Sequence, residues 1–94
     1  MQERPDARGM RFAAWQLRAK IDRIAAVVAR LDGRVSSMAY AGPAADRFRA
    51  KVAIEVARLR EVMRILDEMA DALVRGAAAV EADPTGFYGG GARS

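Results

Sequence analysis

Apolar residues in the first half of the chain recur at spacings that alternate between four and three. The series runs without a miss through Met10, Ala14, Leu17, Ile21, Ile24, Val28, Leu31, Val35 and Met38. Such a heptad series places its members along one face of a helix, so the pattern predicts a helix over residues 11 to 37. Gly33 lies off this face and costs about 1 kcal/mol of helix stability, so we expect the helix to continue through it.

The second half of the chain predicts another long helix, from Pro43 to Ala82. Proline is preset for a first helical turn, and Asp46 places a carboxylate near the positive end of the helix dipole. Asp83-Pro84 marks the end, because a residue before proline disfavours the helical conformation. The apolar stripe of this helix contains Phe48, Val52, Leu59, Leu66, Leu73, Ala77 and Val80, and is widened by Val62, Met63, Ile65, Met69 and Ala70.

Between these helices, the segment "MAYAGP" over 38–43 predicts a turn. Gly42 can supply a positive φ angle, and Pro43 restarts the chain as a helix. The expected fold is therefore all-α, a helical hairpin of two long antiparallel helices over 11–82. Residues 1–10 are expected to form a flexible N-terminus, and the glycine-rich residues 83–94 a disordered tail.

The apolar arc of the second helix is wider than one neighbouring helix can cover. It spans roughly 140° or more, whereas a single antiparallel neighbour buries a narrower seam. Small chains often complete their core by association, so we expect two hairpins to pair into a four-helix bundle. The residues expected in its core and interface are Leu17, Ile21, Ile24, Val28, Leu31, Val35, Phe48, Val52, Leu59, Leu66 and Leu73.

The composition argues against an enzyme or a metal protein. The 94 residues include no cysteine and no histidine, which removes thiol nucleophiles, the commonest general base and the commonest metal ligands. We therefore expect no catalytic residue, no cofactor and no metal. Charged residues recur every few positions from Arg11 to Glu81, so no apolar run reaches the roughly 18 residues of a membrane span. The first ten residues do not resemble a cleavable signal peptide.

The positive charge leaves one alternative to a protein partner. A net charge of +4 and a pI near 10.3 also suit a basic helical protein that binds nucleic acid. Aromatic residues are not interleaved with the basic ones for base stacking, and no helix-turn-helix pattern is recognisable. We therefore expect no nucleic-acid partner, with nucleic-acid binding or another homodimeric structural role as the alternative.

At the turn, an aromatic residue, one spacer and a glycine are followed by "PAADRF" at the start of the second helix. With heptads on both sides and about a hundred residues in all, the chain resembles the WXG (Esx-like) family of small proteins exported by type VII secretion systems. The resemblance covers residues 11–82 or so. It implies a protein made in the cytoplasm, paired with a WXG-like partner or with itself, and secreted folded by the type VII machinery.

Two features depart from the family pattern. Tyr40 stands where the family has tryptophan, which keeps an amphipathic ring but loses the indole donor. The family's export tail, a tyrosine followed four residues later by an acidic residue, is missing, because Ala92 follows Tyr88. The resemblance therefore implies a heterodimer whose partner carries the tail, with Tyr40, Gly42 and Pro43 as the export and turn motif.

Trp15 and Glu55 are candidates for partner specificity. Trp15 lies opposite the seam, so either the regular helix begins after it or its ring contacts another chain. Glu55 falls inside the apolar stripe of the second helix, where a carboxylate needs a cation. Lys20 or Arg34 beside the first seam could reach it, and a basic residue of a partner could serve equally well. A polar seam residue can fix helix register and disfavour wrong partners. The alternative is a glutamate that reaches water near the turn.

Overall fold

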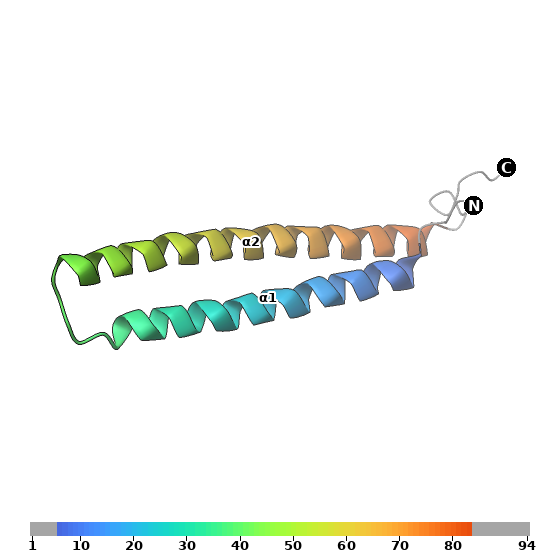
Figure 1. Cartoon of the computed structure of the whole chain (residues 1–94). Helices are drawn as coiled ribbons and strands as arrows, with labels where there is room; N and C mark the ends of the chain where they lie inside the picture. The colour runs from blue at the N-terminus through green and yellow to red at the C-terminus, as the bar shows by residue number, and fades with distance from the viewer. Residues whose placement is uncertain (1–5, 84–94) are drawn as a thin grey trace, which may run out of the picture.

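Two long helices make up almost all of the described chain. The computed structural model describes residues 6–83, in which α1 spans Ala7–Ser36 and α2 spans Pro43–Ala82. The two helices run antiparallel, pack against each other and are joined by one short turn (Figure 1). The predicted all-α helical hairpin is confirmed.

α1 begins at Ala7, four residues before the expected start at Arg11. Asp6 has an extended backbone, and its carboxylate accepts a hydrogen bond from the backbone N–H of Arg8 at 3.1 Å. An aspartate in this place satisfies an amide that the first helical turn leaves without a partner, so the helix can start earlier than the heptad pattern indicates. The expected flexible segment over 1–10 is therefore too long at its C-terminal side.

The other helix limits agree closely with the sequence. α1 continues through Gly33 and ends at Ser36, and α2 ends at Ala82 with Asp83 in an extended conformation. Extended geometry at Asp83 is what a following proline favours. Residues 84–94, expected to form a disordered tail, lie outside the described residues.

The turn between the helices depends on Gly42. This residue has a φ angle of 116°, in the region that favours glycine, which confirms the predicted positive φ. Pro43 occupies the start of α2, and the carbonyl of Gly42 accepts the backbone N–H of Asp46 at 2.9 Å. At the other side of the turn, Ser37 closes α1 by donating its backbone N–H to the carbonyl of Gly33 at 3.0 Å. Both helix ends are thus closed by local contacts.

Each helix contributes one heptad series to the contact between them. The predicted α1 series from Met10 to Met38 is buried or half-buried throughout, as expected of a seam. The α2 series has the same alternating spacing and is also buried or half-buried; its members are Ala45, Arg49, Val52, Val56, Leu59, Met63, Leu66, Ala70, Leu73, Ala77 and Val80. Phe48 was expected in this stripe but is 46% exposed, because it comes one residue before Arg49 and lies about 100° around the helix from it.

The hairpin core is made of small side chains. The buried residues are Ala14, Val28, Ala45, Val56, Ala70 and Ala77. Leucines and isoleucines of both series are only half-buried, and among residues 6–83 no large side chain is fully buried. Two helices have too little surface to enclose such side chains between them, so one hairpin leaves its larger apolar residues partly open to solvent.

Candidate interaction surface

The hairpin has two long flanks, one on each side of the seam. Seam residues alternate between heptad position a, which is followed three residues later by the next seam residue, and position d, which is followed four residues later; Val28 is an a and Leu31 a d residue. The residue before each a position, such as Val27, lies on one flank of its helix, and the residue after each d position, such as Asp32, lies on the other flank. Because α1 and α2 are antiparallel, equivalent heptad positions of the two helices share a flank.

One flank carries ion pairs that join the two helices. The pairs are Arg11 with Glu81, Arg18 with Asp71, and Arg60 with Asp32, and these six residues define the charged flank. Arg18 Nη2 lies 2.6 Å from Asp71 Oδ1, and Arg60 Nη2 lies 3.3 Å from Asp32 Oδ2. The hydrogen bond to Glu81 raises the pKa of Arg11 above its ordinary value. All six side chains are about half exposed, so the pairs add little stability.

The opposite flank carries exposed apolar side chains instead. These are Val27 of α1 and Phe48, Val62, Ile65 and Met69 of α2, each between 36% and 49% exposed. We call the whole side of the hairpin on which they lie the apolar flank. Asp32 pairs with Arg60, so residue 27 lies level with residues near 62 to 65, and four of the five residues gather midway along the hairpin. Within residues 6–83, no ion pair joins the two helices on this flank.

Glu55 lies on the apolar flank and not in the seam. It is exposed, and the buried residue at this level is its neighbour Val56. Both carboxylate oxygens of Glu55 lie 3.4 Å from Nη1 of Arg58, one turn along the same helix. The expected reach to Lys20 or Arg34 is therefore not made, and the alternative of a carboxylate open to water describes Glu55 better.

Trp15 projects from α1 on the side away from the seam. The helix begins before it, so the alternative that regular helix starts only after Trp15 does not hold. Trp15 is 65% exposed, and its ring stacks on that of Phe12, with ring centroids 5.9 Å apart and an interplanar angle of 22°. Trp15 follows the seam residue Ala14 as Asp71 follows Ala70, so it lies towards the side of the charged flank. Its contact with another chain remains a prediction.

The turn holds Tyr40 at the end of the hairpin. The Tyr40 side chain is 66% exposed, and its backbone carbonyl accepts a hydrogen bond from Nη2 of Arg49 at 2.9 Å. Arg49 occupies a seam position of α2, so its stem lies against α1 while its guanidinium closes the turn. Arg49 was not predicted from the sequence, although its spacing of four from Ala45 and three from Val52 is that of a seam residue.

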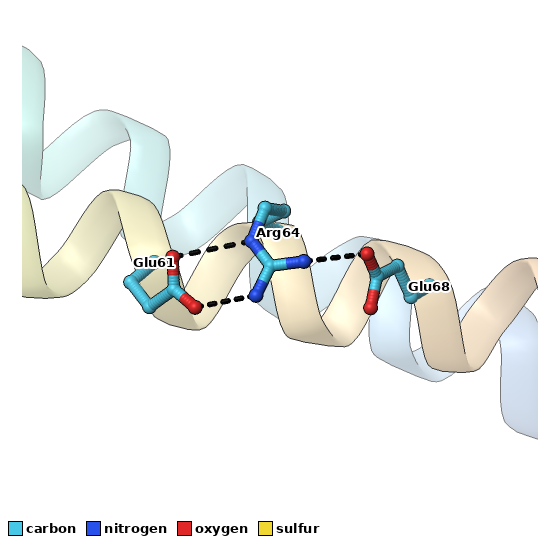
Figure 2. Close-up of polar contacts among 3 residues, drawn as sticks. All are labelled: Glu61, Arg64 and Glu68. Carbon is cyan, nitrogen blue, oxygen red and sulfur yellow. Dashed lines mark hydrogen bonds and ion pairs between the residues drawn. The ribbon is translucent and has the colours of Figure 1, made fainter.

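The outer face of α2 is a solvated, charged surface. Arg64 bonds Glu61 through two nitrogens and Glu68 through one, as Figure 2 shows. The hydrogen bond from Arg64 lowers the pKa of Glu61, and that to Glu61 raises the pKa of Arg64. These oxygens are already paired within one helix, and residues 6–83 contain no cluster of acidic side chains that could hold a metal ion. Neither described helix is long and apolar enough to cross a membrane.

Comparison of the chain with protein-family models, with curated proteins and with solved structures finds no match. The candidate surface therefore has to be interpreted from its own geometry. The two sides of the hairpin differ: the charged groups of the charged flank are paired within the chain, whereas the apolar side chains of the apolar flank are left exposed.

Proposed function

We propose that this protein is a helical-hairpin interaction module that pairs through its apolar flank, forming a four-helix bundle with a second hairpin. The single observation that carries the proposal is that five exposed large apolar side chains lie on the flank that has no cross-helix ion pair. Contiguous exposed apolar surface on a small soluble protein marks an interaction site.

The apolar flank supplies part of the free energy of association. Covering the remaining exposed part of one such side chain is worth about 1 kcal/mol, so the five together contribute roughly 5 kcal/mol. The half-buried leucines and isoleucines of the seam would add to this as a second hairpin covers them. Association costs several kcal/mol of translational and rotational freedom, so the apolar flank and the seam together are needed.

On its resemblance to the WXG family, we further propose that the pair is a type VII secretion substrate, exported folded with a partner that carries the acidic tail. Support comes from the hairpin fold, the aromatic residue at the turn and the helix that follows Pro43. The exposed ring of Tyr40 at the end of the hairpin is available for contact with an export receptor.

Two measurements test the proposal. Light scattering and urea unfolding over a roughly hundredfold range of protein concentration, in about 500 mM NaCl to screen like charges, should show weak dimerisation and an unfolding midpoint that rises with concentration. A cooperatively folded monomer with a constant midpoint would refute pairing of the chain with itself, and a failure to bind a charge-reversed copy as well would refute the pairing surface.

The export step needs its own assay. A tagged chain should reach the culture medium of a host with an intact type VII system and not of the same host lacking the export ATPase. Tyr40→Ala should reduce export while leaving the unfolding free energy unchanged. A large fall in stability would instead assign Tyr40 to capping the hairpin, and release that is independent of the ATPase would reject the secretion route.

A further inference from the structure

The part of the apolar flank that belongs to α1 is basic. Four exposed cationic side chains lie there, at spacings of three, seven and four along the chain: Lys20, Arg23, Arg30 and Arg34. The two acidic residues between them in sequence, Asp22 and Asp32, lie on the side of the charged flank. We call these four residues the basic strip. No ion pair within residues 6–83 involves any of them.

The α2 side of the same flank does not neutralise this charge. Lys51 and Arg58 add two positive charges, and Glu55 adds one negative charge that is already directed at Arg58. The flank therefore carries a formal charge of +5, which exceeds the +4 of the whole chain. The positive charge of this protein is concentrated on the surface that is proposed to pair.

The contrast with the charged flank shows why these cations are unpaired. On the charged flank each cross-helix arginine meets a carboxylate of the other helix. On the apolar flank the α2 residues level with the basic strip are mostly apolar, and the carboxylate of Glu55 pairs with Arg58, so none of the four cations has an ion pair among residues 6–83. A second molecule must supply the carboxylates when the apolar side chains between them are covered.

From this charge distribution we infer that the occupant of the apolar flank is an acidic helical hairpin and not a second copy of this chain. The inference rests on the proposed function, because it specifies the partner for the same surface. Two copies would bring +5 against +5 while covering apolar surface, which opposes pairing. A partner with an apolar strip opposite Val62 to Met69 and carboxylates opposite the basic strip meets both requirements.

The chain itself provides a probe of this chemistry. Lys20→Glu/Arg23→Glu/Arg30→Glu turns the basic strip acidic and leaves the apolar side chains in place. Arg8→Glu/Arg47→Glu/Arg75→Glu is the matched control, since it changes the net charge equally at three exposed cations that lie off the flank and have no ion pair among the described residues. Circular dichroism is used to check that both variants remain helical.

Sedimentation equilibrium of labelled wild type with each variant gives the decisive comparison. In about 50 mM NaCl we expect wild type to bind the strip variant at least tenfold more tightly than itself, and the advantage to shrink severalfold in about 500 mM NaCl. The off-flank control should gain less than threefold. If the control binds as tightly as the strip variant, or wild type prefers itself, the inference is overturned.

A neutral variant covers the case in which the acidic strip does not fold. Lys20→Gln/Arg23→Gln/Arg30→Gln removes repulsion without adding opposite charge, and it should self-associate at least fivefold more tightly than wild type in low salt. Unchanged self-association would contradict the inference.

Two further outcomes separate the inference from the proposed function and from nucleic-acid binding. If association of the wild type is weakened by Ile65→Gln but shows no preference for charge, only the acidic partner is refuted. If no mixture associates, the pairing surface itself is refuted. A 20-base-pair DNA duplex is included, because a steeply salt-dependent complex that the strip variant abolishes would reassign the basic strip to nucleic acid and overturn the inference.

Discussion

Replacing Gly42 by alanine should destabilise the hairpin through the backbone alone. Gly42 has φ 116° and ψ 173°, a combination that side-chain-bearing residues rarely adopt, and nothing lies within 4 Å of the position of an added Cβ. Steric contact is therefore not the cause of the loss. Forcing alanine into such a conformation costs roughly 1 to 3 kcal/mol, and moving away from it disturbs the entry into α2 at Pro43.

The same substitution at Gly33 is a matched control with the opposite sign. Gly33 lies inside α1, and an added Cβ there also meets nothing within 4 Å. Alanine is the better helix former, so Gly33→Ala should stabilise the protein by about 0.5 to 1 kcal/mol, somewhat less if the end of α1 frays.

Urea unfolding followed by circular dichroism measures both changes. With an m-value of about 1 kcal/mol/M, Gly42→Ala should lower the midpoint by roughly 1 to 3 M and Gly33→Ala should raise it by less than about 1 M. All samples need the same protein concentration, because association shifts the midpoint. A neutral or stabilising Gly42→Ala would refute the assigned turn geometry, and equal signs at both glycines would refute the reasoning from backbone conformation.

Three further changes test the seam, the flank and the outer face. Arg49→Ala removes the hydrogen bond to the turn and the packed stem, and should cost about 1 kcal/mol in urea unfolding; an unchanged midpoint would contradict its role in closing the turn. Ile65→Gln should weaken association roughly fivefold by sedimentation while Ile54→Gln, equally neutral but on the outer face, leaves it unchanged; equal effects would argue against the apolar flank. Glu61→Gln should reduce the loss of stability on acidification. The pKa of Glu61 is lowered in the folded chain, so its contribution is present at neutral pH and disappears as the pH falls through that lowered value, and parallel pH profiles for variant and wild type would contradict this.

Local signals in the sequence were enough to predict the hairpin. The heptad series from Met10 to Met38, the glycine-proline pair at the turn and Asp83 before a proline placed the helices to within a few residues. The early start of α1 escaped notice because one capping aspartate carries less signal than a repeated pattern. The positive φ of Gly42 was predictable for the same local reason, since few other residues tolerate it.

The tertiary structure decided which side of α2 faces α1. Apolar residues cover so much of this helix that two adjacent stripes fit its sequence, one through Phe48 and Glu55 and one through Arg49 and Val56. Both stripes have the same 3.5-residue spacing, so spacing alone does not choose between them. Packing along α1 selects the second, which buries Val56, Ala70 and Ala77 and leaves the carboxylate of Glu55 in water. That choice moves Phe48 and Glu55 onto a flank and Arg49 into the seam. It also brings Asp32 to Arg60, 28 residues apart in the chain, and so separates a flank of ion pairs from an apolar one. Such a pairing depends on how two helices lie against each other, which neither helix specifies by its own pattern.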